Sequence, residues 1–78
     1  MAVRTEMRAD EHFAERLLQM RRRLALAQRE LGDLAGLPRE TVGRWERGVS
    51  RPYAGEAVRR VCGILRCRPD WLLWGVED

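Results

Sequence analysis

Three arginines, Arg39, Arg44 and Arg47, lie within the stretch PRETVGRWER that begins at Pro38. Each guanidinium is a planar fork of donors that suits phosphate oxygens, carboxylates and the O6 and N7 edge of guanine. Glu40, between them, could accept a hydrogen bond from a cytosine amino group. These residue types point to binding of an anionic partner, above all a nucleic acid.

The same stretch contains residues that need burial. Val42 and Trp45 are three positions apart and would share one side of a helix. A helix over 38–47 would therefore have an apolar back and a basic front. Two simpler interpretations stay open: Glu40 and Arg44, four apart, could form a surface ion pair of about 0.3 to 0.5 kcal/mol, and the other arginines could be solvated surface charges.

Length and charge limit the class of protein. The 78 residues allow one small domain. The net charge is +3, and all 15 basic residues are arginine. An arginine-only chain favours anionic partners, although GC-rich codon usage would give the same composition.

The sequence offers little for catalysis or metal binding. Its one histidine, His12, lies in a mostly charged stretch, and the C-x4-C spacing of Cys62 and Cys67 fits neither a paired-cysteine zinc site nor a disulfide scaffold. Reduced, buried thiols are expected. The N-terminus lacks the apolar segment of a signal peptide. We therefore expect a cytoplasmic protein that is not an enzyme and uses no cofactor or metal.

The elements that must position the arginines are helices. Apolar residues recur at three- and four-residue spacing, and no alternating run is long enough for a strand. Asp10 could cap a first helix, Pro38 and Pro69 suit first helical positions, Gly36 suits a left-handed cap, and Gly75 ends the last helix. Five helices are predicted, the first with a buried stripe of Phe13, Leu17, Met20 and Leu24, and the others over 28–35, 38–47, 52–66 and 69–74.

Taken in chain order, the five predicted helices resemble those of the Xre/Cro-type helix-turn-helix repressors, from about Phe13 to Gly75. LALAQRELGDLAGLPRETVGRWERG is similar to the family pattern of a Gln opening helix two, a small residue and Gly at the turn, and W-E-x-G ending helix three. The later RP and PDWLLWG are similar to its closing segments. The resemblance implies an all-α, compact five-helix bundle of the lambda-repressor-like type, with helix 38–47 in the major groove of DNA.

The resemblance also implies roles for single residues. Gly43, which has no side chain, would contact a base only by close approach. Arg21 and Glu46 would form a structural ion pair beneath the reading helix, unless they are independent surface charges. The base-reading candidates are Arg39, Glu40, Gly43 and Arg44, and the phosphate-binding candidates are Gln28, Thr41 and Arg47.

Five positions depart from the family pattern, namely Ala27, Gly32, Leu34, Gly43 and Arg66, and two of them bear on helix ends. Ala27 replaces the hydroxyl residue that usually caps helix two, at a cost of about 1 kcal/mol. Arg66 stands where a glycine often ends helix four, which predicts either a strained left-handed residue or a longer turn.

Residues 1–9 are expected to form a flexible N-terminal arm and residues 10–78 the helix-turn-helix DNA-binding domain. Arg4 and Arg8 would either reach an adjacent groove or belong to a frayed end. Repressors of this kind pair two copies on half-sites, so a homodimer is expected. Leu73 and Trp74 are the candidate dimer contacts, although Trp71 and Trp74 could instead both bury against helix four.

The function expected from these features is that of a sequence-specific, double-stranded DNA-binding transcriptional regulator, a repressor acting on a palindromic operator. Fold alone does not determine function. The alternatives are an antitoxin or another protein-interaction module with a toxin or other protein partner, and a restriction-modification controller.

Overall fold

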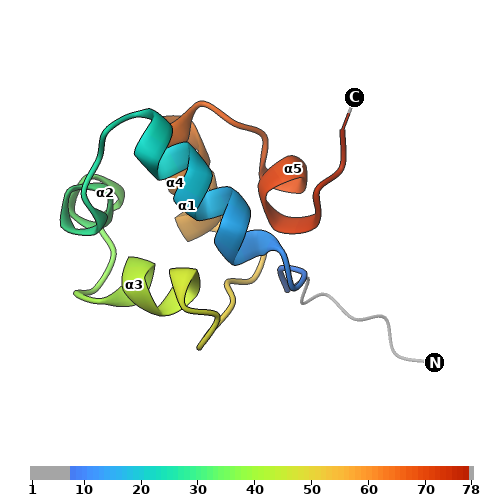
Figure 1. Ribbon diagram of the computed structural model, residues 1–78, viewed down its shortest axis with the longest axis horizontal. Helices are drawn as coiled ribbons and strands as arrows, with labels where there is room; N and C mark the ends of the chain where they lie inside the picture. Colours follow the sequence, from blue (N-terminus) through green and yellow to red (C-terminus); the bar gives the residue numbers. More distant parts are fainter. Residues whose placement is uncertain (1–7, 78) are drawn as a thin grey trace.

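The computed structural model describes residues 8–77, and their helices follow the predicted order (Figure 1). The all-α fold class and the five-helix bundle are confirmed. None of the helices within residues 8–77 is long and apolar enough to cross a membrane. The helices are α1 (Phe13–Arg23), α2 (Gln28–Ala35), α3 (Thr41–Glu46), α4 (Glu56–Leu65) and α5 (Pro69–Trp74).

One hydrophobic core joins these helices, because α1 packs on α3 and α5 while α4 packs on α2 and α5. The predicted stripe of α1 is buried at Phe13 and Leu17, but Leu24 is 41% exposed. Leu24 was wrongly predicted to be buried because α1 ends one residue earlier, so the helical spacing no longer applies there. The largest fully buried side chains are Phe13, Leu17, Leu31, Val58, Val61, Leu65, Leu72 and Leu73.

Two helices begin later than the sequence predicted. α3 starts at Thr41, because Glu40 has a left-handed backbone with φ of 72° that a helix from Pro38 could not contain. α4 starts at Glu56, because the carbonyl of Pro52 accepts a hydrogen bond of 3.2 Å from the Ala9 amide. The helices predicted over 38–47 and 52–66 are therefore shorter in the structure.

The ends of α2, α4 and α5 follow local rules. Gly36 is left-handed, as predicted, and Gly75, predicted to end the last helix, is left-handed as well. Arg66, at the end of α4, is also left-handed, with φ of 59°, so the strained alternative is the one the chain adopts. At the start of α2, the Glu30 carboxylate accepts a 2.8 Å hydrogen bond from the Ala27 amide, which partly replaces the missing capping hydroxyl.

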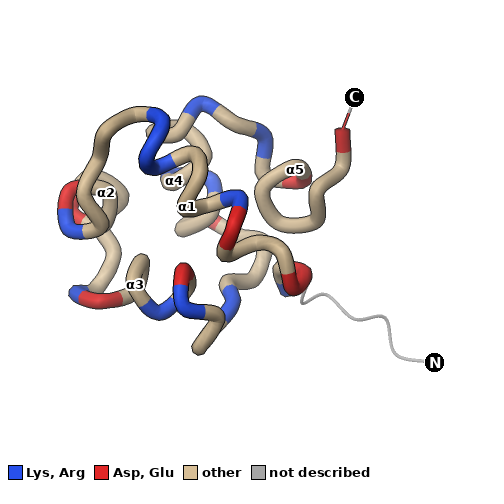
Figure 2. Tube along the Cα trace, viewed as in Figure 1, with Lys and Arg blue, Asp and Glu red and all other residues tan. Residues whose placement is uncertain are grey.

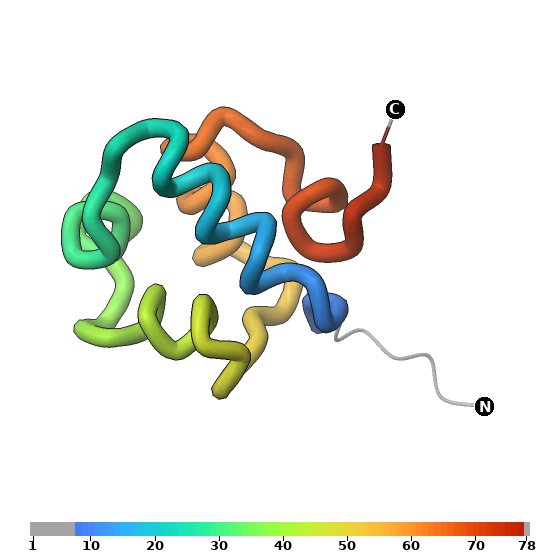
Figure 3. The backbone as a smooth tube through the Cα atoms, in the orientation of Figure 1, coloured from blue at the N-terminus to red at the C-terminus, as the bar shows by residue number. Residues whose placement is uncertain are grey.

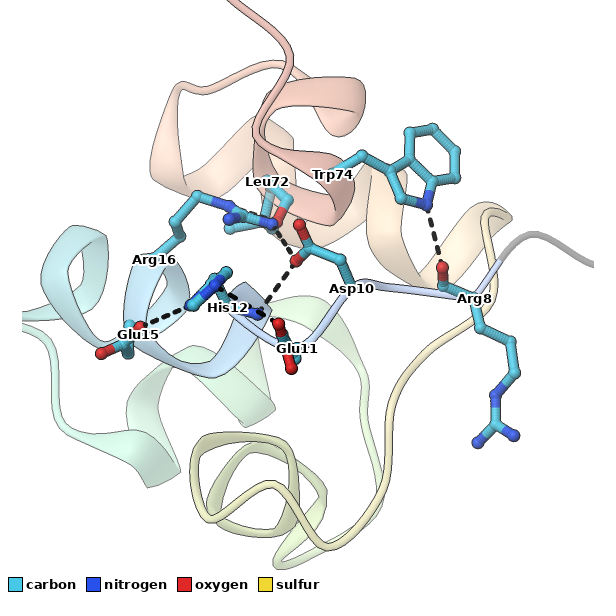
Figure 4. A network of polar contacts seen from close by, with 8 residues as sticks. All are labelled: Arg8, Asp10, Glu11, His12, Glu15, Arg16, Leu72 and Trp74. Atoms are coloured by element: carbon cyan, nitrogen blue, oxygen red, sulfur yellow. Dashed lines mark hydrogen bonds and ion pairs between the residues drawn. The ribbon is translucent and has the colours of Figure 1, made fainter.

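The chain just before α1 runs beside α5 (Figure 3). Ala9 is buried, the Asp10 amide donates to the Leu73 carbonyl at 2.9 Å, and the Trp74 indole donates to the Arg8 carbonyl at 2.9 Å (Figure 4). Arg8 and Ala9, which were assigned to the flexible arm, therefore pack on the bundle. The rest of the predicted arm, including Arg4, lies outside the described residues.

Asp10 ties the start of α1 to α5 rather than acting as its N-cap, a position held by His12. One Asp10 oxygen accepts from Arg16 at 2.6 Å and from the His12 amide at 3.1 Å, while Arg16 also donates to the Leu72 carbonyl (Figure 4). Burial acts to raise the pKa of Asp10, but the hydrogen bond and charge of Arg16, with a smaller contribution from His12, lower it below 3.8. This network therefore stabilises the fold above the unfolded-state pKa and is lost as pH falls through the folded value.

Candidate nucleic-acid interface

The turn between α2 and α3 is held by backbone and side-chain bonds. After the left-handed Gly36, the Leu37 amide returns to the Gly32 carbonyl at 2.8 Å. Arg60 of α4 donates to the Ala35 carbonyl at 2.7 Å. The Gly32 and Ala35 carbonyls near the end of α2 are thus satisfied, and Arg60 ties α2 to α4 next to the turn.

The apolar back of α3 faces the core, as its spacing predicted. Val42 and Trp45 are buried, and the Trp45 ring meets Phe13 of α1 edge to face, with centroids 5.8 Å apart and planes at 76°. This packing sets which side of α3 is left to solvent.

Beneath α3, the structure brings Arg21 and Glu46 together in a two-pronged ion pair. The guanidinium donates to the two carboxylate oxygens at 2.6 and 2.9 Å and also to the Leu26 carbonyl at 2.7 Å. Only 12% of the Arg21 side chain and 5% of the Glu46 side chain are exposed. The hydrogen bond to Glu46, against the effect of burial, raises the pKa of Arg21, so the guanidinium stays charged.

Gln28, predicted to hold phosphate, has a contact that the sequence did not indicate. Its amide nitrogen donates to Glu46 at 2.8 Å, so Gln28 at the first position of α2 is tied to the last residue of α3. The two residues are 18 positions apart and belong to different helices, and no helical spacing relates them.

Gly43, predicted to face a base edge, is buried under two neighbouring side chains. A Cβ at this position would lie 3.2 Å from the Arg47 Nη1 atom and 3.2 Å from the Gln28 Oε1 atom. Gly43 therefore leaves the space in which Gln28 and Arg47, both phosphate candidates, come together over α3.

The other candidates lie on the outer side of this unit. Arg44 and Arg47 are exposed, and Thr41 is half-buried at the first position of α3. Arg39 and Glu40 are also exposed, but in the turn before α3 rather than on the helix. The Glu40–Arg44 ion pair that remained open from the sequence is not formed within the part of the chain that the structure describes.

A hollow of about 330 Å³ lies between α2 and α3, and Arg39, Glu40 and Gly43 are among its lining residues. Figure 2 shows basic segments in α3 and in the chain on both sides of it, with acidic segments between them. Over residues 8–77, no group of three or more His, Cys, Asp or Glu side chains is arranged to hold a metal ion. The surface thus combines an exposed side of α3 with arginines in the helix and its flanking turns, and an α-helix is an element that the major groove of a duplex admits.

Comparison with known proteins agrees with this geometry. Residues 17–72 match the family model described as helix-turn-helix. The chain belongs to the helix-turn-helix family. The resemblance to Xre-type, phage-repressor-like regulators is thereby confirmed, and α2 and α3 are its helix-turn-helix.

Two curated relatives are regulators. The HTH-type transcriptional regulator DicA of Escherichia coli K12 is 36% identical over 66 residues, 85% of this chain and 48% of DicA. Repressor protein C2 of Salmonella phage P22 is 34% identical over 63 residues, 81% of this chain and 29% of C2. The chain thus spans less than half the length of either relative.

Solved structures share the fold. The P22 c2 repressor in complex with a synthetic operator has a TM-score of 0.75 at 33% identity, covering 82% of this chain and 96% of that one. The restriction-modification controller protein C.AhdI from Aeromonas hydrophila has a TM-score of 0.68 at 32% identity, covering 77% of this chain and 89% of that one.

Proposed function

We propose that this helix-turn-helix chain is a sequence-specific transcriptional repressor that binds double-stranded DNA as a homodimer, with α3 in the major groove of a palindromic operator. The observation that carries the proposal is the outer side of α3 and its flanking turns. There Arg39, Arg44 and Arg47 are exposed, and within residues 8–77 none of them has an ion-pair partner. Exposed guanidiniums on an anchored helix and its flanking turns suit phosphates and guanine edges.

In this proposal, bases are read from α3 and the turn before it. Arg44, on the exposed side of α3, donates to guanine O6 and N7, while Arg39 and Glu40 reach base edges from the turn. Gly43 is buried beneath Gln28 and Arg47, so it acts here by leaving room for those side chains rather than by contacting a base. The P22 c2 repressor, at 33% identity, is solved in complex with a synthetic operator, which supports the proposal that this chain binds an operator.

Phosphate is held around the start of α2 and the end of α3. Gln28 occupies the first position of α2, where backbone N–H groups lack helical partners and the helix dipole favours an anion. Arg47 and Gln28 both lie beside Gly43, and Thr41 begins α3. The Gln28 amide is already oriented by Glu46, so little ordering remains when it binds.

The homodimer would place two copies of α3 on half-sites about 34 Å apart. Leu73 cannot contribute to its interface as predicted, because the side chain is fully buried in the core. Trp74 is half-buried and stays a candidate contact.

The proposal is tested by selecting bound sequences from a random pool of duplex DNA. Enrichment of a palindrome would support specific binding, two-fold symmetry and a half-site spacing together. A reporter promoter carrying the selected operator should then be transcribed less when the chain is present. An unenriched pool would overturn the DNA-binding proposal, whereas increased transcription would overturn only repression.

Alanine substitutions of Arg44 and Arg47 are expected to change binding to that operator in different ways. Arg44→Ala should cost about 1 to 3 kcal/mol and relax the preference at one base position of each half-site. Arg47→Ala should weaken binding to all sequences alike and lower the salt slope by about one unit for each lost phosphate contact.

Both variants would be titrated against the operator and its single-base substitutions at several salt concentrations. The orientation of α3 is wrong if Arg44→Ala weakens every sequence equally while Arg47→Ala changes the base preference.

Gly43→Ala should lower the affinity for DNA without lowering the stability of the fold. Alanine favours a helix over glycine by up to about 1 kcal/mol, so stability should rise or stay unchanged. The added methyl group must displace the ends of Gln28 and Arg47, so affinity for DNA should fall. Urea unfolding and fluorescence anisotropy measure the two effects.

Gly63→Ala is the matched control, since Gly63 lies in α4 with no atom within 4 Å of an added Cβ. It should gain stability and bind DNA like the wild type. If Gly43→Ala also binds like the wild type, Gln28 and Arg47 do not hold phosphate in the arrangement proposed.

A further inference from the structure

The end of α4 brings the two cysteines of the chain together. The left-handed Arg66 lets the Cys67 amide return to the Cys62 carbonyl at 3.1 Å. This six-to-one hydrogen bond defines a Schellman motif, in which the side chains of the two bonded positions commonly contact each other. The same turn that strains Arg66 thus brings the two cysteines to positions whose side chains can contact each other.

The two thiols differ in access. Cys62 is buried in the core beneath α4, whereas Cys67 is half-buried and lines a surface hollow of about 350 Å³ between α1 and α5. Met20 and Trp71 form apolar walls of that hollow, and it is open to solvent. A small reagent can therefore reach Cys67 while Cys62 stays behind it.

The environment also distinguishes the thiols chemically. A hydrogen bond from Cys62, opposed by burial, lowers the pKa of Cys67. The same hydrogen bond, burial, the Cys67 charge and the Asp70 charge all raise the pKa of Cys62. Of the other charged groups at the hollow, Arg68 pairs with Asp70 at 3.0 Å, and Glu77 lies at its rim. Cys67 is the thiol that ionises first.

We propose that Cys67 is a peroxide-reactive thiol and that Cys62 is its resolving partner, so that oxidation closes a disulfide within one chain. A reactive, accessible thiol beside a second cysteine is the arrangement that redox-sensing sites use. This inference concerns the α4–α5 turn and does not depend on the proposed binding of DNA.

The reaction consumes one hydrogen peroxide. The Cys67 thiolate attacks one peroxide oxygen, forming an S–O bond and breaking the O–O bond, and the leaving hydroxide takes up a proton to become water. The Cys62 sulfur then attacks the Cys67 sulfenic acid, forming the S–S bond and breaking the S–O bond, and its proton leaves with the hydroxide as a second water. Two thiols are oxidised by two electrons, and the peroxide is reduced.

The test treats the folded, reduced chain with hydrogen peroxide, then denatures it, alkylates free thiols and measures intact mass. The wild type should lose both alkylation sites while staying a monomer on a non-reducing gel. Cys67→Ser should keep Cys62 reduced, because the buried thiol is not reached. Cys62→Ala should stop at a Cys67 sulfenic acid that dimedone traps, or join two chains through Cys67.

Three results would overturn the proposal: wild-type thiols that stay reduced, a wild type that forms only disulfides between chains, or Cys62 that oxidises as fast in Cys67→Ser as in the wild type. The rate at which iodoacetamide alkylates Cys67 would also be measured as a function of pH. This rate would not change if Cys62 only packed against its neighbours. Loss of the Cys62 donor in Cys62→Ala should slow Cys67 alkylation near neutral pH by roughly two- to tenfold. Cys62→Ser, which retains a donor, should restore the rate, and equal rates in all three proteins would also contradict the proposal.

Discussion

Glu46→Ala is expected to lower the free energy of unfolding by about 3 to 5 kcal/mol. The substitution removes both carboxylate acceptors from Arg21, which is only 12% exposed and stays charged. It also removes the acceptor of the Gln28 amide. Since small domains are stabilised by only about 5 to 15 kcal/mol in total, much of this domain's stability would be lost. Urea unfolding followed by circular dichroism measures the change.

An exposed acid provides the matched control. Glu56 pairs with Arg60 at 3.2 Å, one turn apart on α4, but 76% of its side chain is exposed. Glu56→Ala should change stability by about 0.5 kcal/mol or less. If Glu46→Ala costs no more than Glu56→Ala, the buried pair does not support the fold.

A double substitution distinguishes the effect of a stranded Arg21 charge from the effect of losing the Glu46 side chain. Arg21→Met with Glu46→Leu removes both ions and leaves neither charge stranded. This double variant should be more stable than Glu46→Ala but should bind DNA poorly, because Gln28 has lost the partner that orients it. Wild-type affinity in a folded double variant would show that the orientation of Gln28 does not matter for binding.

The affinity for the selected operator should fall steeply with salt. If a dimer makes six to ten phosphate contacts, the association constant should drop about 10³- to 10⁵-fold between 50 and 200 mM salt, because each contact releases condensed counterions. The exposed arginines around α3 and the start of α2 motivate this expectation. Fluorescence anisotropy with labelled operator measures it, and a nearly flat response would contradict the phosphate contacts.

Arg66→Gly is a control for loss of an arginine elsewhere. Arg66 lies in the α4–α5 connection, which Figure 1 shows on the side of the bundle away from α3. Glycine should relieve the left-handed strain and stabilise the fold by about 1 kcal/mol while leaving the salt slope unchanged. A reduced slope in this variant would show that the dependence on salt reflects net charge rather than contacts at α3.

Features set by local rules could be predicted from the sequence. α2 spans the predicted residues, because Gly36 takes the left-handed conformation that ends a helix at little cost. α5 begins at Pro69 and ends at Trp74 for equally local reasons. The apolar back of α3 and the family itself also followed from spacing and motif.

The prolines did not predict where the two shortened helices start. Pro38 is a suitable first helical residue, yet Glu40 is left-handed and α3 begins only at Thr41. Pro52 is equally suitable, yet its carbonyl is bonded to Ala9 from the other end of the chain. A propensity describes one segment in isolation, and a bond to a distant segment can outweigh it.

The arrangement of the site was likewise decided by contacts between segments distant in sequence. Helical spacing indicates that two residues share a side of one helix, but not which neighbouring element covers that side. Leu73 is therefore buried where it was predicted to be a surface contact, and Gly43 lies under Gln28 and Arg47. The sequence alone determined the helices and the family of this protein, whereas the packing of α1, α2 and α3 around Glu46 decided which side chains meet at the candidate interface.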